Sequence, residues 1–378
     1  MTMQKLPFVL MRGGTSKGVF LRADLMPEKR DELTHLILDI FGSPDRRQID
    51  GLGGADKLTS KVAIIGRSNH DRADVTYLFG QVGMDHAEVD YNLNCGNLSA
   101  AVGLYALQER LAIPTDEIAH VRIHNLNTDR IITASVQVSH GIPQTRGDCR
   151  IDGVPGTGSP IELDFSQATG AITGTLFPLG GPCSSLDIPD LGSIPVSVVD
   201  GANLVVYVTA DSIGIKGTEM PQEINANPTL CARLTAIRKA AAYACGLREY
   251  WENAKAPSTP IMVILQKPSN YTSYSGKQAV FAKDLHLTCR QFASGSATKT
   301  LAATVTATTG MAARIPNTLV HDMTGNAAPE HETLALGHPS GIIHVRSSVR
   351  SGNSGHHVEQ SSIIRTARRI AEGYTYLH

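Results

Sequence analysis

The sequence predicts an α+β protein rich in antiparallel sheet, and two observations lead to that prediction. Short runs of β-branched and aromatic residues recur along the chain, and most of the 35 glycines and 19 prolines fall between them. Only four segments have the length and apolar spacing of a helix. Strands are expected at residues 7–11, 62–65, 75–82, 120–124, 130–138, 194–199, 205–209, 261–265 and 342–349, and helices at residues 28–41, 98–110, 228–245 and 298–313.

The helix at residues 98–110 is predicted to be buried inside a sheet. Apolar side chains fall on almost every face of it, as in a helix surrounded by other elements. The segment at residues 298–313 has the same character, and strands precede and follow both helices, so the chain reads as two loosely similar halves. The Gly-, Pro-, Ser- and Asp-rich residues 182–192 mark the expected boundary. Two similar halves that face each other would place an active site in the cleft between them.

The composition describes an ordinary globular protein and excludes several classes of function. Over 378 residues, 34 Lys and Arg stand against 35 Asp and Glu, so no basic stripe is available for a nucleic acid. No apolar run approaches the roughly 18 residues that a membrane-spanning helix needs. The six cysteines are dispersed without a CxxC pair, which favours free thiols and a cytoplasmic location.

The glycine-rich residues 11–18 form the first candidate site. They depart from the phosphate-binding pattern G-x-x-x-x-G-K-[ST], because Lys17 precedes the last glycine and no helical pattern follows. Backbone N–H groups, two hydroxyls and two cations instead suit a bound carboxylate. The candidate ligands are Arg12, Thr15, Ser16 and Lys17. A plain glycine turn between two strands is the alternative interpretation.

Lys61 is the second candidate, at the mouth of the apolar strand predicted at residues 62–65. The loop before it fails the dinucleotide pattern G-x-G-x-x-G, because Asp56 occupies the last position. A lysine that is partly desolvated near other cations has a lowered pKa and can accept a proton near neutral pH. The alternative is a solvated surface charge, the usual state of a lysine.

Cys95 is the third candidate, in the segment Asn94-Cys-Gly-Asn97 just before the buried helix. At or beside the N-cap, the helix dipole and unpaired N–H groups favour a thiolate and any anion that binds above it. Gly96 permits a close approach of the backbone. The alternative is a small core hydrophobe, and the other five cysteines have no comparable setting.

The start of the helix predicted at residues 298–313 is the fourth candidate. The two-half pattern places this helix end opposite the first, which gives a second anion-binding end. Ser294, Lys299 and the upstream Arg290 are the candidate partners of a carboxylate there. A plain capped helix is the alternative. The 14 histidines include no H-E-x-x-H motif and the chain has no G-x-S-x-G, so neither a metal site nor a serine hydrolase is predicted.

Ordered motifs run through the whole chain, and six of them fall in the first 100 residues. They read MRGGTSKG (11–18), GSPD (42–45), RQIDGLGGAD (47–56), TSKVA (59–63), YLFGQV (77–82), NCGN (94–97), IDGVPG (151–156), GHPSG (337–341) and IRTAR (364–368). Together they resemble the 2-methylaconitate cis-trans isomerase (PrpF) family. That family includes 4-oxalomesaconate tautomerases, methylitaconate Δ-isomerases and aconitate isomerases.

The resemblance implies a diaminopimelate-epimerase-like fold. Two similar domains would each form a curled, mostly antiparallel sheet around a central helix, with the active site in the interdomain cleft. We expect the N-terminal domain at residues 1–185, completed by residues 360–378, and the C-terminal domain at residues 186–359. The resemblance also implies proton chemistry without a cofactor on small unsaturated di- or tricarboxylates.

The family's important lysine matches Lys61, and its helix-start cysteine matches Cys95. Racemases of the wider superfamily use two opposed cysteines, but residues 294–299 contain none, so an asymmetric acid/base pair is expected here. Lys61 would remove a γ proton, amides would stabilise the dienolate, and Cys95 or Lys61 itself would return a proton. The residues expected to bind substrate are Arg12, Thr15, Ser16, Lys17, Gly53, Gly54, Gly96, Asn97, Ser294 and Lys299.

The substrate and the alternatives stay open at this point. Residues 77–82 and 94–102 favour an aconitate-type tricarboxylate, whereas residues 51–61 and 151–156 look more like the oxalomesaconate tautomerases. A methylitaconate Δ-isomerase is a further alternative, and a non-catalytic carboxylate-binding protein is the alternative from a different class. The expected partner is a small polycarboxylate, with no nucleic acid and no membrane, and a homodimer is ordinary for a chain of this size.

Overall fold

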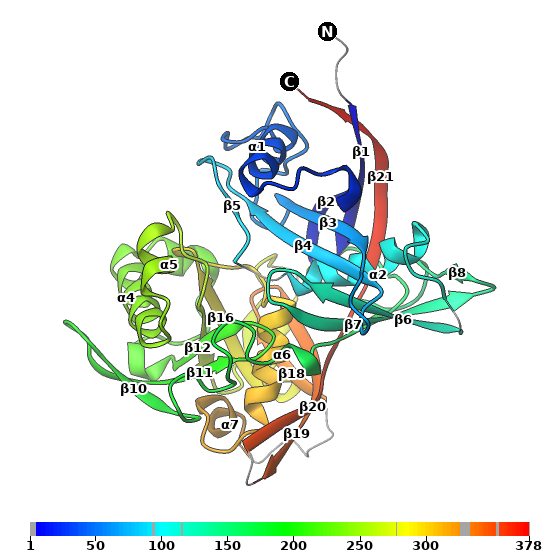
Figure 1. The fold of residues 1–378 in the computed structure, drawn as a ribbon. Coiled ribbons are helices and arrows are strands. Elements are labelled where there is room, and N and C mark those ends of the chain that lie inside the picture. The colour runs from blue at the N-terminus through cyan, green and yellow to red at the C-terminus, as the bar shows by residue number, and fades with distance from the viewer. Residues whose placement is uncertain are drawn as a thin grey trace. The chain divides into compact units, whose positions relative to one another are not determined.

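The structure is a computed structural model that describes residues 5–92, 95–114, 116–276, 278–325, 333–352 and 355–377. By its internal contacts the chain divides into two compact units. The first comprises residues 1–163 with residues 364–378, and the second comprises residues 164–363. The domain limits expected from the sequence stay a prediction. In each unit a sheet surrounds one helix, α2 in the first and α6 in the second (Figure 1).

In the first unit, a mixed sheet curls around α2. Strand β1 pairs antiparallel with β2 and with β21, β2 runs parallel to β3, and β3 pairs antiparallel with β4. Strand β4 then runs parallel to β6, which pairs antiparallel with β7. Helix α2 contacts β1 and β2 as well as β6 and β7, which is possible only because the sheet curls. The elements are β1 (Lys5–Gly13), β2 (Ser16–Arg22), η1 (Ala23–Leu25), α1 (Arg30–Phe41), β3 (Lys61–Arg67), β4 (Val75–Val82), β5 (Val89–Asp90), α2 (Gly96–Gln108), β6 (Ile118–Asn125), β7 (Arg130–Ser139), β8 (Ile142–Pro143), β9 (Ile161–Asp164) and β21 (Ala367–Tyr376).

The central helix α2 is buried on all sides, as predicted. Every residue from Gly96 to Leu107 is buried. Its small residues let strands approach closely: a Cβ added to Gly103 would lie 2.6 Å from the Cβ of Ala134 on β7. A helix of this kind can only form with a sheet around it, because it has no polar face to turn toward water.

The outer face of this sheet is covered by α1, which confirms the helix expected at residues 28–41. Leu33, Ile37 and Phe41 pack in one cluster with the β3 side chains of Val62 and Ile64. The helix ends where Gly42 adopts a left-handed conformation with φ of 64°. The even-numbered side chains of β3 therefore point to α1, and the odd-numbered side chains, which include Lys61, point to the opposite face.

In the second unit the same arrangement surrounds α6. Strand β11 pairs antiparallel with β10 and β12, β12 runs parallel to β13, and β13 pairs antiparallel with β16. Strand β16 runs parallel to β18, and β18, β19 and β20 pair antiparallel in that order. The elements are η2 (Ser166–Ala168), β10 (Ser184–Ile188), β11 (Gly192–Asp200), β12 (Leu204–Thr209), η3 (Asp211–Ile213), α3 (Pro221–Asn225), α4 (Pro228–Ala244), α5 (Arg248–Asn253), β13 (Ile261–Gln266), β14 (Tyr271–Thr272), β15 (Ala279–Val280), η4 (Ala282–Asp284), β16 (Leu287–Ala293), β17 (Ser296–Ala297), α6 (Ala303–Ala313), α7 (Leu319–Thr324), β18 (Leu334–His338), β19 (Gly341–Gly352) and β20 (Gly355–Arg365).

Helix α6 begins five residues later than the sequence analysis expected, at Ala303 instead of residue 298. Ser294 and Gly295 have φ values of 48° and 73°. They form the two-residue turn of the hairpin between β16 and β17, where Ala293 pairs with Ser296. Two successive positive φ values are typical of a type I′ turn, whose twist matches that of the flanking strands. Ser294 and Lys299 therefore do not lie in the first turn of this helix, and that expectation was wrong.

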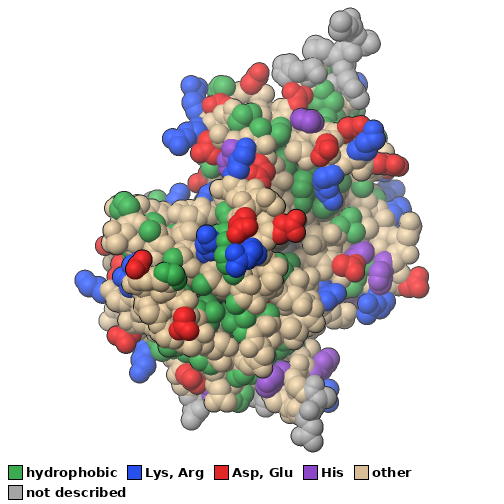
Figure 2. Space-filling model, turned by 60° about the vertical axis from the view of Figure 1, so that its left-hand side comes forward, with side chains coloured by type: hydrophobic (Ala, Val, Ile, Leu, Met, Phe, Trp, Pro, Cys, Tyr) green, Lys and Arg blue, Asp and Glu red, His purple; other side chains and the backbone are tan. Residues whose placement is uncertain are grey.

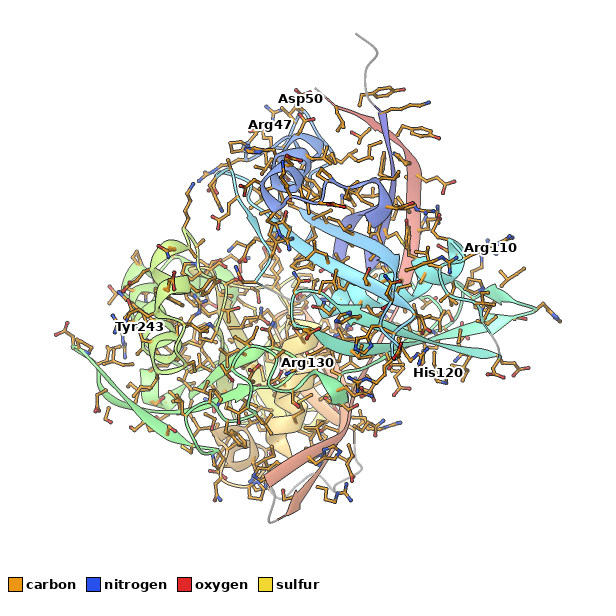
Figure 3. All side chains as sticks on the ribbon, viewed as in Figure 1. Arg47, Asp50, Arg110, His120, Arg130 and Tyr243 are labelled. Carbon is orange, nitrogen blue, oxygen red and sulfur yellow. The ribbon has the colours of Figure 1, made fainter. Side chains whose placement is uncertain are left out.

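Helix α4 covers the outer face of the second sheet and confirms the helix expected at residues 228–245. Asn227 caps its start by accepting a hydrogen bond from the N–H of Leu230 at 3.0 Å, with Pro228 in the first turn. Near its other end, Tyr243 (labelled in Figure 3) donates a hydrogen bond of 2.8 Å to Glu252 and so links α4 to α5. This layer occupies the place that α1 has in the first unit.

The surface carries both signs of charge. Lys and Arg side chains are interspersed with Asp and Glu over the face shown in Figure 2, and no single-sign stripe is visible there. All six cysteines are free. Within the described residues, no helix has the length and hydropathy to cross a membrane.

Candidate active site

Lys61 is the first residue of β3, and its side chain is buried with 8% exposure. Its Nζ donates a hydrogen bond of 2.7 Å to Oε1 of Gln81, the residue that pairs with it across β3 and β4. The same nitrogen lies 5.0 Å from the centre of the Phe79 ring. Among the described residues no carboxylate forms an ion pair with Lys61. The Lys61 amine is thus buried, with an amide oxygen and an aromatic ring as its neighbours.

Gln81 is held in place by the loop before Lys61. Its Nε2 donates to the carbonyl oxygens of Ser60 at 2.9 Å and of Lys57 at 3.2 Å. With both N–H groups engaged by carbonyls, the amide oxygen is turned toward Lys61. The motif at residues 77–82 was recognised in the sequence, but Gln81 and Phe79 were not predicted as site residues.

The loop that leads to Lys61 is closed by Gln48. Its Oε1 accepts hydrogen bonds from the hydroxyl of Ser60 at 2.6 Å and from the N–H of Ala55 at 2.8 Å. A Cβ on Gly53 would overlap the Gln48 side chain, and one on Gly54 would overlap Thr59. Close packing of the loop is thus reason enough for both glycines, and their expected place in an anion site stays a prediction.

Cys95 occupies the N-cap position of α2 and is 8% exposed. Its Sγ lies 3.9 Å from the hydroxyl oxygen of Ser16, which is buried at the start of β2. The Cys95 side chain makes no capping hydrogen bond to this helix end. The N–H groups of its first turn, from Gly96 onward, are oriented toward the space above the thiol, as at any helix N-terminus. Asn94, the residue before Cys95, lies outside the described residues.

The glycine hairpin between β1 and β2 packs on the first turn of α2. A Cβ on Gly13 would lie 2.5 Å from the carbonyl oxygen of Asn97, and one on Gly14 would overlap the Asn97 amide. On the next strand, a Cβ on Gly18 would lie 2.9 Å from the carbonyl oxygen of Lys61 and 3.0 Å from a methyl of Leu98. Gly18 therefore keeps the start of β3 close to the start of α2, which brings Lys61 and the Cys95 helix end to one face of the sheet.

Asn97 links this hairpin to the C-terminal segment. Its Nδ2 donates to Oγ1 of Thr15 at 3.2 Å, and its Oδ1 accepts from Nε of Arg365 at 3.1 Å. Arg365 is 5% exposed, and burial lowers the pKa of its guanidinium to about 10. The motif at residues 364–368 was recognised in the sequence, but this arginine was not predicted as part of the site.

Arg12 supports the hairpin from its other side. Its Nη1 donates to the carbonyl oxygens of Gly14 at 3.0 Å and of Thr366 at 2.8 Å. Burial lowers the pKa of Arg12, and the nearby charge of Arg368 lowers it further. Lys17 is half-buried, and its N–H donates to the carbonyl of Leu58 at 2.9 Å. Direct substrate binding by Arg12 and Lys17 stays a prediction.

The candidates from the second unit have different surroundings. Arg290 is buried, and its guanidinium donates to the carbonyl oxygens of Glu219 at 2.7 Å and of Thr218 and Cys289 at 2.9 Å. Arg290 therefore stabilises backbone carbonyl groups of the second unit. Lys299 is exposed, with its Nζ 5.3 Å from the ring centre of Tyr274. Binding of substrate by Ser294 and Lys299 stays a prediction.

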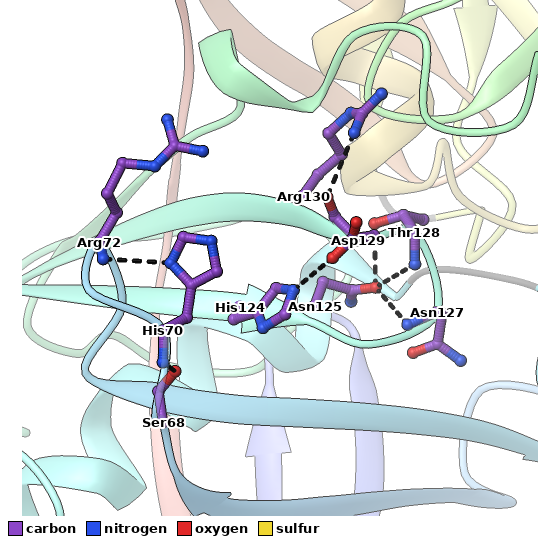
Figure 4. Close-up of polar contacts among 9 residues, drawn as sticks. All are labelled: Ser68, His70, Arg72, His124, Asn125, Asn127, Thr128, Asp129 and Arg130. Carbon is purple, nitrogen blue, oxygen red and sulfur yellow. Dashed lines mark hydrogen bonds and ion pairs between the residues drawn. The ribbon is translucent and has the colours of Figure 1, made fainter. Parts of the chain in front are cut away.

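Of the two histidines in Figure 4, His124 lies in β6 and His70 in the connection between β3 and β4. His124 Nε2 lies 2.7 Å from Oδ1 of Asp129, and its ring centre is 5.1 Å from that of His70. Beside it, the Asn125 amide oxygen accepts hydrogen bonds from the N–H and the hydroxyl of Thr128. These contacts hold the connection between β6 and β7. The described part of the chain contains no group of three or more His, Cys, Asp or Glu side chains placed to hold a metal ion.

The first unit thus assembles one set of groups from three segments. Lys61 supplies a buried amine, Cys95 a thiol at a helix N-terminus, and the hairpin at residues 13–16 supplies hydroxyls and amides. A proton can be taken by the amine, and negative charge on oxygen can be stabilised by the helix end and the hydroxyls. These are the functions that proton transfer on a carboxylate substrate needs.

Comparison with known proteins agrees with this chemistry. A family model described as PrpF protein matches residues 3–378. A 3-methylitaconate isomerase of Eubacterium barkeri is 44% identical over 99% of this chain and 97% of its own length. A 2-methyl-aconitate isomerase of Shewanella oneidensis is 34% identical over 98% of this chain and 96% of its own.

Solved structures agree on the fold. The crystal structure of a methylitaconate-delta-isomerase matches with a TM-score of 0.83 at 44% identity, over 100% of this chain and 96% of that one. A hydroxyproline epimerase from Agrobacterium vitis matches with a TM-score of 0.56 at 8% identity, over 99% and 93% of the two chains, a likeness of fold alone. The expected epimerase-like fold is confirmed. Both kinds of comparison show that the chain is an isomerase of the PrpF family.

Proposed function

We propose that the protein moves a proton on small unsaturated di- or tricarboxylates, without a cofactor, and thereby shifts or isomerises a carbon–carbon double bond. The observation that carries the proposal is the environment of Lys61. Its amine is buried against Gln81 and Phe79, and within the described residues it has no carboxylate partner. In its neutral form such an amine can take a proton from carbon as a general base.

The first step breaks a C–H bond. The γ carbon of such a substrate is conjugated, through the double bond, to a carboxylate or keto group. Lys61 in its neutral form takes the γ proton onto Nζ, and the electron pair of that bond spreads to oxygen as a dienolate. The Gln81 amide oxygen then accepts a hydrogen bond from the ammonium group that forms.

The negative charge of the dienolate falls near the start of α2. The hydroxyls of Thr15 and Ser16 accept hydrogen bonds from Asn97 and Cys95 and so keep their own protons to donate. Together with the N–H groups of the first turn, they are held by the surrounding structure and need not reorganise during the reaction. Each such donor lowers the barrier only if it contacts the oxygen on which the charge develops.

The second step returns a proton to carbon. We assign this step to Cys95, whose thiol lies at the same helix end, with Ser16 as its hydrogen-bonding neighbour. Delivery to the α carbon leaves the double bond between the β and γ carbons, a 1,3 shift. If the intermediate rotates and is reprotonated on the γ carbon, the product is the cis-trans isomer.

Methylitaconate-type dicarboxylates and aconitate-type tricarboxylates are the substrate classes to test first. Relatives that act on each of the two classes cover 99% and 98% of this chain, at 44% and 34% identity. Oxalomesaconate, which tautomerises by the same proton transfer, is the third class. The same two residues serve all three, so the substrate is decided by the groups that bind the carboxylates.

The test is proton exchange in heavy water, followed by proton NMR. We expect the wild-type protein to incorporate deuterium at the γ carbon of cis-aconitate, 2-methylaconitate, methylitaconate or oxalomesaconate. The variant Lys61→Met keeps the length of the side chain and loses the base, so exchange should fall at least 10²-fold, the low end of what general base catalysis contributes.

Lys29→Met is the matched control, because Lys29 is an exposed lysine of the same unit, paired with Glu32. It should exchange at the wild-type rate. Near-normal exchange in Lys61→Met would remove Lys61 from the mechanism. A wild-type protein that binds these acids but exchanges no proton would instead be a carboxylate-binding protein.

A further inference from the structure

We propose that Arg365 and Asn97 are positioning residues that turn the hydroxyl proton of Thr15 outward as a donor for a substrate carboxylate. The inference rests on the proposed function for the identity of the ligand. It assigns to Asn97 a different part from the direct ligand expected from the sequence. It also gives a part in the site to Arg365, which lies 268 residues away along the chain.

The hydrogen bonds from Arg365 to Asn97 and from Asn97 to Thr15 form a relay, and Arg365 sets its direction. A guanidinium group has only N–H donors and accepts no hydrogen bond. The atom of Asn97 that faces Arg365 Nε at 3.1 Å must therefore be the amide oxygen. The amide nitrogen then points the other way, to Oγ1 of Thr15 at 3.2 Å.

An amide nitrogen can only donate, so Thr15 accepts this hydrogen bond through an oxygen lone pair. The proton of the Thr15 hydroxyl is then left to be donated elsewhere. Within the described residues, the Thr15 hydroxyl makes no second hydrogen bond. Thr15 is half-buried, whereas Asn97 and Arg365 are buried, so the relay begins in the interior and ends at its most accessible member.

The surrounding structure keeps the relay from rearranging. Arg365 also donates to the carbonyl oxygen of Ile364 at 2.8 Å. A side chain on Gly14 would overlap the Asn97 amide and lie 3.0 Å from Cδ of Arg365. The hairpin thus covers the amide, and Asn97 cannot exchange its oxygen and nitrogen without leaving the guanidinium facing an N–H group.

The consequence is selectivity for an anion. A threonine hydroxyl free to rotate can donate or accept, and binds neutral and negative oxygens alike. With its acceptor side occupied by Asn97, Thr15 presents a donor, which suits a carboxylate and rejects a ligand N–H group. A hydrogen bond to a charged partner is also the stronger kind.

The test is calorimetric binding of tricarballylate, a saturated tricarboxylate that offers no conjugated proton to remove. We expect Thr15→Val and Arg365→Met each to raise the dissociation constant about tenfold, as for loss of a hydrogen bond to a charged group. The double variant should bind no more weakly than the weaker single variant, because both changes remove the same donor. Arg365→Lys, which retains a donor for the Asn97 amide oxygen, should bind more tightly than Arg365→Met.

Additive losses in the double variant would overturn the relay, as would wild-type binding by Arg365→Met or failure of the wild-type protein to bind tricarballylate. Thr133→Val, a half-buried threonine of β7 outside the relay, is the control and should bind as wild type. Binding that follows the relay in a protein without proton exchange would leave this inference standing while the proposed function fails.

If Arg365→Met does not fold, the variant Asn97→Asp tests the direction of the Thr15 proton instead. It keeps an acceptor for Arg365 but presents an acceptor to Thr15, which must then donate its proton inward. In that background Thr15→Val should cause no further loss. A further tenfold loss would show that Thr15 had kept its outward proton, and would overturn the relay.

Discussion

The two units share one order of strands and differ in what their central helices carry. In the first, β1, β2, β3, β4, β6 and β7 alternate antiparallel and parallel pairings, with α2 between β4 and β6. In the second, β11, β12, β13, β16, β18 and β19 repeat that alternation, with α6 between β16 and β18. The architecture is repeated although the residues that fill it are not.

The proposed base and proton donor, Lys61 and Cys95, both belong to the first unit. Its parallel pairing opens with Val62, preceded by the buried Lys61, whereas the equivalent pairing in the second opens with Ile261, preceded by Pro260. The N-cap of α2 is Cys95, and that of α6 is Ala302. The comparison teaches that the fold needs a buried helix and a curled sheet in both units. The amine of Lys61 and the thiol of Cys95 have no counterpart at the equivalent positions of the second unit, Pro260 and Ala302.

The largest expected effect comes from the N-cap position of α2 and has no counterpart at the N-cap of α6. Cys95→Ala removes the proton donor assigned to the second step, so double-bond transfer should fall at least 10²-fold. Exchange at the γ carbon should continue, because Lys61 remains. Proton NMR in heavy water measures both quantities in one sample.

Ala302→Cys is the matched change in the second unit. It creates a thiol at the equivalent helix start, where no buried amine precedes the paired strand, and both rates should stay at their wild-type values. Full double-bond transfer in Cys95→Ala would assign the proton return to Lys61. A gain in either rate from Ala302→Cys would mean that the two units are chemically interchangeable.

The next effect concerns how tightly each hairpin packs on its helix. A Cβ on Gly13 would lie 2.5 Å from a backbone oxygen of α2, whereas a Cβ on Gly201 would meet the side chains of Thr308 and Met311 on α6 at 2.8 to 2.9 Å. Side chains can move aside more readily than backbone. Gly13→Ala should therefore lower the free energy of unfolding by about 3 kcal/mol and Gly201→Ala by about 1 kcal/mol, the two ends of the range for overpacking.

The midpoint of thermal unfolding, measured for both variants, checks this order. Gly295→Ala is a useful third variant, because a Cβ there meets nothing within 4 Å and only the positive φ of 73° opposes it. Equal losses for Gly13→Ala and Gly201→Ala would show that the α2 helix end can shift as easily as a side chain.

The fold could be predicted where local pattern and tertiary packing agree. Helices α1, α2 and α4 begin and end within about two residues of their predicted limits, because apolar spacing and capping residues mark them. The start of α6 could not be predicted from its Ala- and Thr-rich sequence, since the same residues fit a helix or a hairpin. The Ser294-Gly295 turn was the missed signal.

The site could be predicted only where its residues stand in recognisable motifs. Lys61, Ser16 and Cys95 were found in this way. Gln81 was missed because a polar residue near Phe79 in a predicted strand fits the ordinary alternation of apolar and polar side chains. Arg365 was missed because its hydrogen-bond partner Asn97 lies 268 residues away along the chain, and nothing local marks an arginine as buried.

The smallest expected effect compares two buried tyrosines. Tyr207 on β12 shares a hydrogen bond of 3.1 Å with Thr309 on α6, whereas the hydroxyl of Tyr77 on β4 is buried without a partner among the described residues. Burial raises the pKa of Tyr77 well above its usual value, and its neighbour Cys95 adds to that rise. Tyr207→Phe should cost about 1 kcal/mol of unfolding free energy, the net value of a typical hydrogen bond. Tyr77→Phe should cost nothing or increase stability, because it removes an unsatisfied hydroxyl. Denaturant unfolding measures both changes. A clear loss of stability in Tyr77→Phe would mean that this hydroxyl has a partner in solution, such as a water beside Cys95. The first unit would then be as fully hydrogen-bonded at this position as the second.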